Sequence, residues 1–123
     1  MPATVSFILP VHDAADTVQQ ALERVLRADL GHPELRREII IVDDASTDGT
    51  VAILRHAAAV GTARVCFHPE TLGPGAALST GLALATGDIV VVVDPSLGYD
   101  PAEASRLLAP IVAGDADVVY GSR

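Results

Sequence analysis

Residues 38–49, EIIIVDDASTDG, contain the pattern that decides the fold. Glu38 to Val42 predicts a strand, and its apolar residues follow one another without alternating with polar ones. This continuous pattern indicates a strand that is buried on both faces. Asp43 and Asp44 follow directly, and a loop rich in turn-forming residues leads to a predicted helix. A strand of this kind is typical of a parallel sheet covered by helices on both sides.

Strand-like and helix-like segments alternate along the rest of the chain. Apolar runs predict strands at residues 4–9, 38–42, 63–67, 88–93 and 118–120. Apolar spacing and capping patterns predict helices at residues 16–28, 50–60, 75–85 and 101–113. Their expected apolar faces are Val18, Ala21, Leu22, Val25 and Leu26; Val51, Leu54 and Ala58; and Leu78, Leu82 and Ala85. Residues 1–123 are therefore expected to form a single α/β domain with a doubly wound, mostly parallel sheet and helices on both faces.

Composition limits the classes of function. Half of the 123 residues are hydrophobic and only 3% are aromatic, so the core must be aliphatic. Sixteen acidic residues face eight basic ones, and the net charge of −8 argues against binding nucleic acid or an anionic membrane by charge. Cys66 is the single cysteine. It excludes an internal disulfide and fits a reducing compartment.

Targeting signals do not stand out in the sequence. The first ten residues lack the basic region of a signal peptide, and no apolar run approaches the ~20 residues of a membrane span. We therefore expect a cytoplasmic protein with no membrane span in this chain.

Acidic residues gather at the predicted strand ends, which meet at one edge of a parallel sheet. Ligands of such sheets bind beyond the carboxyl ends of the strands. Carboxylates that converge there repel one another, so they are typical of a cation site or of a ligand rich in hydrogen-bond donors. Asp43, Asp44 and Asp94 end buried strands and are the functional candidates. Asp48 and Asp100 are interpreted as caps of turns and helices, and a cap is also the alternative to function for Asp13.

Two other classes with a similar sheet fit less well. A phosphoacceptor receiver domain needs its acid pair after the first strand and a lysine near the end, but the pair here follows the second strand and no lysine exists. A dinucleotide-binding domain needs its glycine fingerprint directly after a strand and a small residue at position 78. Gly73 and Gly75 lie in a longer loop, and position 78 is Leu78.

Four segments resemble a known family in order and spacing. They are FILPVHDAADT (7–17), EIIIVDDASTDGT (38–50), HPETLGPGAALSTGLALATGDIVVVVDPSLGYDP (68–101) and ADVVYGSR (116–123). Together they resemble the nucleotide-sugar-binding half of a family 2 glycosyltransferase with the A-type fold. Within that family they are most similar to the polyprenyl-phosphate (dolichol-phosphate) mannosyl- and glucosyltransferase branch.

The resemblance implies a role for each matching residue. Pro10 would receive the nucleotide base, and Asp43 and Asp44 would hold the base and ribose. Gly73 and Gly75 match the loop near the donor sugar. Asp94 matches the first acid of a DAD motif that binds the Mg²⁺ or Mn²⁺ bridging the donor's diphosphate. Arg123 ends the matching GSR.

The sequence departs from the family pattern at several positions near the diphosphate or base. The second acid of the DAD motif is Ser96, and the polar residue two further on is Gly98. The loop lysine of the family is Pro74, and the arginine of the following helix is Ser79. The first-strand motif PxYNE has become residues 10–14, PVHDA. These losses predict a weakened metal site and weaker donor binding, because both countercharges of the diphosphate are affected.

The expected function is binding of a nucleotide-diphosphate sugar, GDP- or UDP-hexose, for inverting hexose transfer to a polyprenyl phosphate or similar acceptor. In the family the general base and the acceptor groove lie beyond the matched segment. No residue is therefore assigned a catalytic role, and whether this chain alone is an enzyme stays open. The alternative is a non-catalytic nucleotide-binding or interaction module.

Two further expectations concern the surface and the histidines. An unpaired sheet edge and exposed apolar area would favour a homodimer. His68 is interpreted as a packing or turn residue rather than a catalytic one, and His12 stands where relatives have a tyrosine near the base.

Overall fold

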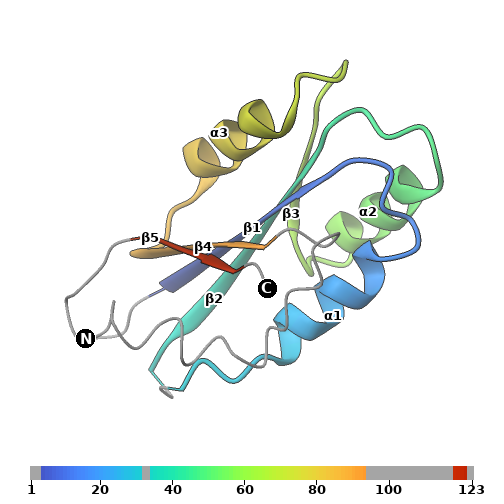
Figure 1. Cartoon of the computed structure of the whole chain (residues 1–123). Helices are drawn as coiled ribbons and strands as arrows, with labels where there is room; N and C mark the ends of the chain where they lie inside the picture. The colour runs from blue at the N-terminus through green and yellow to red at the C-terminus, as the bar shows by residue number, and fades with distance from the viewer. Residues whose placement is uncertain (1–3, 32–33, 94–117, 122–123) are drawn as a thin grey trace.

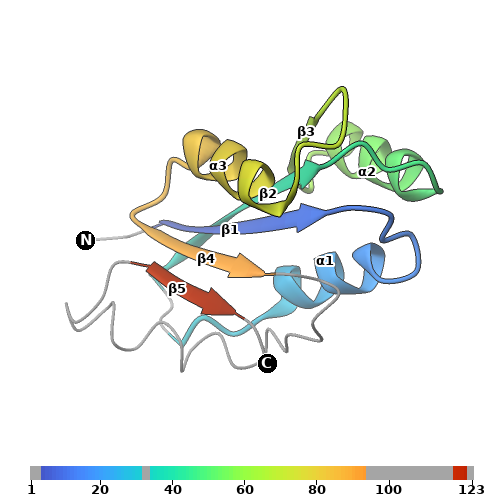
Figure 2. The ribbon, with the colours of Figure 1, turned by 45° about the horizontal axis from the view of Figure 1, so that its top comes forward.

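A single parallel sheet organises the chain in the computed structural model, which describes residues 4–31, 34–93 and 118–121. The sheet order is β3-β2-β1-β4-β5, and every neighbouring pair is parallel (Figures 1 and 2). The strands are β1 (Thr4–Val11), β2 (Arg36–Asp43), β3 (Arg64–Phe67), β4 (Ile89–Val93) and β5 (Val118–Gly121). All five predicted strands are confirmed, with bounds shifted by one or two residues.

Helices cover both faces of this sheet. They are α1 (Val18–Arg27), α2 (Thr50–Ala59) and α3 (Pro74–Leu84). α1 and α2 lie on one face, and α3 lies on the other (Figure 1). The chain changes face between β3 and β4, because β4 returns to pair with β1 on the side away from β2. The predicted doubly wound α/β fold is confirmed.

β2 explains why the continuous apolar pattern belongs to a central strand. Ile39 and Ile41 belong to the core under α1 and α2, while Ile40 and Val42 pack with Ala77 of α3. Successive side chains of a strand point to opposite faces, so a strand with helices on both sides needs apolar residues at every position. The interpretation of residues 38–42 is confirmed.

A proline directly after the predicted strand at 4–9 favours an end to the strand there, but this prediction is wrong because Pro10 lies inside β1. β1 continues to Val11, which is in register with Asp43 of β2. The carbonyl oxygen of Val11 accepts a hydrogen bond from the backbone N–H of Asp44, 2.9 Å away, so the polar groups of Val11 face β2. Those of Pro10 face the other side. The described ladder with β4 ends at the pair Ile8 and Val92, so Pro10 removes no ladder hydrogen bond there.

Asp16 and Gln19 have the spacing of a capping box, which predicts the start of the first helix, but this capping box does not form. α1 begins at Val18 rather than Asp16, and Thr17 at its N-cap makes no side-chain capping bond. The carbonyl oxygen of Ala14 accepts the N–H groups of Thr17 and Val18, so residues 14–17 form a separate turn before the helix. The apolar face at Val18, Leu22 and Val25 is confirmed, but Leu26 is 40% exposed.

The apolar faces predicted for the other two helices are corrected. α2 buries Thr50, Leu54 and Ala57, so Ala58 is not on its core face. α3 buries Ala77 and Gly81, whereas Leu82 is 44% exposed. The cause in α3 is close approach to β1: a Cβ at Gly81 would lie 2.4 Å from Cγ2 of Ile8. Only small residues fit this contact, so the leucines lie beside it.

Some predictions fall outside the described residues. They are the helix at 101–113 and the roles of Asp94, Ser96, Gly98, Asp100 and Arg123. In the part of the chain that the structure describes, no helix is long and apolar enough to cross a membrane.

Candidate functional site

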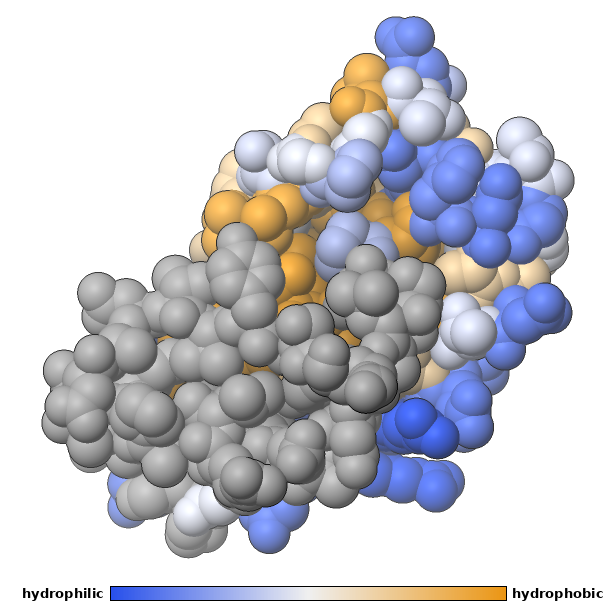
Figure 3. All heavy atoms as spheres, in the orientation of Figure 1, coloured by the Kyte–Doolittle hydropathy of each residue, from blue (hydrophilic) through white to orange (hydrophobic). Residues whose placement is uncertain are grey.

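The carboxyl ends of β1, β2 and β3 lie level with one another. Val11 is in register with Asp43, and Asp43 is in register with Phe67. The loops that follow these strands, residues 12–17, 44–49 and 68–73, therefore meet at one edge, which we call the carboxyl edge. Hydrophilic residues cover the surface where the β2–α2 loop lies, at the right of Figure 3.

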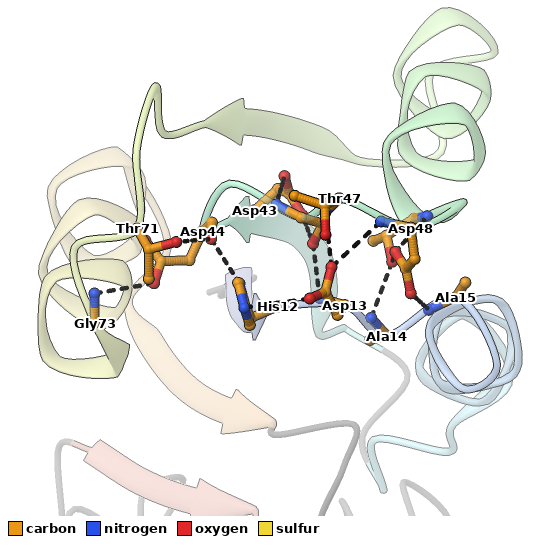
Figure 4. A network of polar contacts seen from close by, with 12 residues as sticks. His12, Asp13, Ala14, Ala15, Asp43, Asp44, Thr47, Asp48, Thr71 and Gly73 are labelled. Atoms are coloured by element: carbon orange, nitrogen blue, oxygen red, sulfur yellow. Dashed lines mark hydrogen bonds and ion pairs between the residues drawn. The ribbon is translucent and has the colours of Figure 1, made fainter.

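Asp44 joins two of these loops (Figure 4). Its Oδ1 accepts a hydrogen bond from the backbone N–H of Leu72 at 2.8 Å, and its Oδ2 accepts one from the N–H of Gly73 at 2.9 Å. Asp44 is 4% exposed. The N–H of Leu72 and the His68 side chain lower the pKa of this carboxyl, more than burial raises it. The carboxylate is therefore ionised and holds the loop before α3.

His68 completes the surroundings of Asp44. Its Nδ1 lies 2.9 Å from Oδ1 of Asp44, and its Nε2 lies 2.8 Å from Oγ1 of Thr80 on α3. The backbone N–H of His68 donates to the carbonyl oxygen of Asp43 at 2.8 Å. With both ring nitrogens bonded and the side chain 6% exposed, His68 is a structural residue. This confirms the interpretation made from the sequence.

Asp43 is held inside its own loop. Its Oδ2 accepts the N–H of Ser46 at 3.1 Å, and its Oδ1 accepts the Ser46 hydroxyl. The turn that allows this passes through Ala45, whose φ of 58° lies in the left-handed region. Asp43 is 1% exposed, so it shapes the β2–α2 loop from within.

Asp13 and Asp48 connect the β1–α1 loop to the β2–α2 loop. Oδ1 of Asp13 accepts the N–H of Thr47 at 2.7 Å, and Oδ2 of Asp48 accepts the N–H of Ala15 at 3.2 Å. Asp48 also accepts the N–H of Thr50 at 2.9 Å at the start of α2. The interpretation of Asp48 as a cap is confirmed, whereas Asp13 binds the neighbouring loop instead of capping a turn or helix of its own. Together with Asp44, they bind three loops into one unit (Figure 4).

His12 follows β1 directly and is exposed, with 48% of its side chain accessible. Its Nδ1 lies 2.7 Å from the carbonyl oxygen of Asp44. A carbonyl only accepts, so Nδ1 carries the proton and Nε2 is the nitrogen left for another partner. This hydrogen bond, followed by the charges of nearby acids, raises the pKa of His12 above its ordinary value.

The structure places most of the predicted donor-binding residues together. Asp43, Asp44 and Gly73 lie at the carboxyl edge, and Gly75 is in the first turn of α3. Pro10 is in register with Val42, one residue before the end of β1. Gly73 has a φ of 100°, which only glycine adopts without strain. This backbone conformation explains why the motif has a glycine at this position. Asp94 lies outside the described residues.

The sequence did not reveal which groups each acidic side chain of the carboxyl edge binds. The contacts of Asp44 with the loop at Leu72 and Gly73 span almost thirty residues and have no local pattern. The same holds for the bond between His12 and Asp44. The one signal present in the sequence was that His12 and His68 both follow predicted strands that end at the same edge.

Comparison with known proteins identifies the family of this chain. The profile of glycosyl transferase family 2 matches residues 6–123. The chain belongs to this family. The resemblance drawn from the sequence motifs is therefore confirmed.

The chain is similar to curated transferases from several organisms. An undecaprenyl-phosphate 4-deoxy-4-formamido-L-arabinose transferase from Proteus mirabilis is 31% identical over 112 residues, which cover 89% of this chain and 34% of the relative. The chain thus spans about a third of the length of the curated relatives it matches.

Two solved structures share the fold. A mannosyltransferase from Pyrobaculum calidifontis in complex with GDP-Man and Mn²⁺ is 29% identical, with a TM-score of 0.69, over 89% of this chain and 33% of that one. Glucosyl-3-phosphoglycerate synthase from Mycobacterium tuberculosis, in complex with Mn²⁺, UDP and glucosyl-3-phosphoglycerate, is 31% identical. Its TM-score is 0.67, over 89% of this chain and 39% of that one.

Proposed function

We propose that this chain binds the nucleotide-diphosphate sugar of a family 2 glycosyltransferase, which transfers a hexose with inversion to a polyprenyl phosphate or a similar acceptor. The observation that carries the proposal is the carboxyl edge itself, where Asp44 fixes the loop at Gly73 beside the end of β1. Doubly wound sheets bind nucleotides at this edge, where the strand order reverses. Here the order reverses between β1 and β4.

Asp43 and Asp44 serve the nucleoside in this proposal mainly by shaping its pocket. The two oxygens of Asp44 accept three hydrogen bonds from the protein, two of them on Oδ1. A carboxylate has about four lone-pair positions, so Oδ2 has room for one more donor such as a base N–H or a ribose hydroxyl. In this proposal Pro10, which is in register with Val42, receives the base, and Gly73 and Gly75 at the start of α3 lie near the donor sugar.

The metal depends on Asp94 in this proposal. Among the described residues, no group of three or more histidine, cysteine or acidic side chains is arranged to hold a metal ion. The carboxylates of Asp13, Asp43, Asp44 and Asp48 already accept backbone or hydroxyl donors. Mg²⁺ or Mn²⁺ is held by one or two carboxylates together with substrate phosphates and water, which Asp94 and a diphosphate can provide. We propose a weak site, because Ser96 and Pro74 remove the second acid and the loop lysine.

Isothermal titration calorimetry tests this function directly. GDP and UDP are titrated into the protein with and without Mn²⁺, and we expect binding that requires the metal. Asp94→Ala should abolish the metal-dependent part. Asp88→Ala is the matched control, because Asp88 lies at the opposite edge and accepts the N–H of Thr4. Absence of binding at millimolar nucleotide would contradict the proposal and favour a non-catalytic interaction module.

Self-association is a separate proposal. β3 is an edge strand of the sheet formed by the described residues. Exposed apolar residues lie in β3 and in the segments before and after it: Val60 is 59% exposed, Phe67 39% and Leu72 52%. Exposed edges and apolar surface favour pairing with a second copy. Light scattering over a dilution series should show a dimer that Phe67→Lys weakens, and a monomeric mass throughout would contradict it.

A single domain and a cytoplasmic location complete the proposal. Cys66 is free, and free thiols persist in reducing compartments. Cell fractionation of the tagged protein should recover it with cytoplasmic material. Residues 1–123 should unfold in one transition by circular dichroism and by fluorescence, and separate transitions would argue against one domain.

A further inference from the structure

The carboxyl edge is rich in acidic residues, which disfavour the binding of an anionic ligand. The loops at 12–17, 44–49 and 68–73 contain five acidic residues, two histidines and no arginine. The six arginines among the described residues lie elsewhere. Arg36, Arg37 and Arg64 begin strands at the opposite edge, Arg24 and Arg27 end α1, and Arg55 is exposed on α2. A diphosphate at the carboxyl edge therefore meets no described arginine.

His12 is the exposed side chain of these three loops that can carry a positive charge. His68 is buried, and both of its ring nitrogens are bonded to protein groups. His12 lies directly beyond the end of β1, the strand that borders the reversal of strand order. It is therefore in the crevice region where doubly wound sheets receive nucleotides.

The ring of His12 is oriented rather than free. The hydrogen bond from Nδ1 to the carbonyl oxygen of Asp44 fixes the ring on the same residue that holds the β3–α3 loop. Nε2 is then directed away from this anchor. Among the described residues, the acid that it approaches is Asp13, with 3.4 Å between Nε2 and Oδ2. This distance exceeds that of a good N–H···O hydrogen bond, and both side chains are exposed, so the pair is weak. A ligand oxygen can compete for the Nε2 proton.

We propose that His12 is the protein's cationic contact for the anionic part of the bound nucleotide sugar, donating from Nε2 in its protonated form. This inference rests on the proposed function. It gives the site a countercharge in place of the loop lysine, and it makes donor affinity depend on pH.

The direction of this dependence follows from the groups around the ring. Asp13, Asp43 and Asp44 face His12 and favour its charged form, and they add to the effect of the bond to the Asp44 carbonyl, so the pKa of His12 is raised. Protonation increases as the pH falls toward and below this value. Donor binding should therefore strengthen from about pH 8 to about pH 6, where nearby carboxylates stay ionised.

The experiment measures the dissociation constants of GDP-mannose and UDP-glucose with Mn²⁺ from about pH 6 to about pH 8. Nucleotide sugars are the probes because their diphosphate has no terminal phosphate that titrates in this range. We expect wild-type affinity to rise about fivefold toward the acid end, as for a charge-assisted hydrogen bond near the surface. His12→Gln should bind the nucleotide sugar at every pH with about the weaker affinity that the wild type shows near pH 8. His12→Arg should keep the tighter affinity at every pH.

His56→Gln is the control, because His56 is exposed on α2 and should leave the wild-type pH profile unchanged. Asp13→Asn supplies a second readout: Asn keeps the acceptor for the N–H of Thr47 but removes a charge beside His12, so the pH profile should move to lower pH. Thermal melts show that each variant is folded.

The outcomes separate the two proposals. Donor binding that is equal in wild type and His12→Gln at every pH overturns the role of His12 and leaves the proposed function standing. Affinity that rises with pH and is lost in His12→Arg also overturns it, since the neutral ring would then bind the metal. Absence of donor binding in the wild type at any pH contradicts the proposed function and this inference with it.

Discussion

Nδ1 of His68 lies 2.9 Å from Oδ1 of Asp44, and each side chain is only 6% exposed. This buried contact engages Oδ1 of Asp44, so that Oδ2 is the oxygen with room for a ligand donor. The pair ties the end of β2 to the end of β3 and, through the N–H groups of Leu72 and Gly73, to the start of α3. The carboxyl edge is thus held in shape before any ligand arrives.

Asp44→Asn should destabilise the protein by about 2 kcal/mol, because the amide keeps one acceptor oxygen but turns an NH₂ donor toward the buried N–H groups that Asp44 binds at Leu72 and Gly73. Urea denaturation at neutral pH measures this as a lower midpoint with an unchanged slope. The exposed Asp16 supplies the control, and Asp16→Asn should stay within about 0.5 kcal/mol of wild type. Equal midpoints for the two variants would mean that the pair contributes little.

Acid should weaken the fold through the same carboxyl. The pKa of Asp44 is lowered in the folded protein by the N–H of Leu72 and by His68. Its stabilisation is therefore complete above the unfolded value of about 3.9 and is lost as the pH falls through the lower folded value. Urea midpoints measured from about pH 6 to about pH 2 should fall more steeply for wild type than for Asp44→Asn. Parallel curves would contradict this assignment.

Gly81→Ala should cost about 2 kcal/mol, because the added Cβ would overlap Cγ2 of Ile8 and the helix would have to move from the sheet. In an Ile8→Ala background the same change should cost much less, and a double-mutant cycle measures the difference. Gly75→Ala is the control for stability, since a Cβ there meets nothing within 4 Å. Equal costs of Gly81→Ala in both backgrounds would rule out the contact as the cause.

Ala45→Gly should stabilise the protein by about 1 kcal/mol, because Ala45 has a φ of 58° and glycine adopts this conformation without the Cβ clash. Ala52→Gly, at an exposed interior position of α2, should change stability by about the same amount in the opposite direction. Thermal melts compare the two. Destabilisation by both glycines would show that Ala45 is not strained.

The fold could be predicted because its strongest signals are local. The run at 39–42 has apolar residues at every position, which favours a strand between two helical layers, and the alternation of elements then favours the parallel sheet. The core-facing side of each helix was harder to predict. The leucines of α3 look like its core face, but close approach of Gly81 to Ile8 decides which side packs on the sheet.

The site could be predicted only in part, because position along the chain does not reveal partners. Asp43 and Asp44 stand out as acids at the end of a buried strand. The sequence does not reveal that Ser46 donates to Asp43, or that the backbone N–H groups of Leu72 and Gly73 donate to Asp44. The sequence identifies His12 only as the residue that stands where relatives have a tyrosine. Its bond to the Asp44 carbonyl depends on the register of β1 with β2, which only the three-dimensional structure gives.

Paramagnetic broadening by Mn²⁺ tests most directly whether the carboxyl edge binds a metal-bridged nucleotide sugar. Amide signals are recorded with Mn²⁺ alone and with Mn²⁺ plus GDP-mannose or UDP-glucose. We predict that the nucleotide sugar selectively increases broadening at carboxyl-edge amides such as those of His12 and Gly73, and that Asp94→Ala removes this increase. Broadening centred on Ser6 and Gly87 at the opposite edge, or a pattern that the nucleotide sugar does not change, would contradict the account.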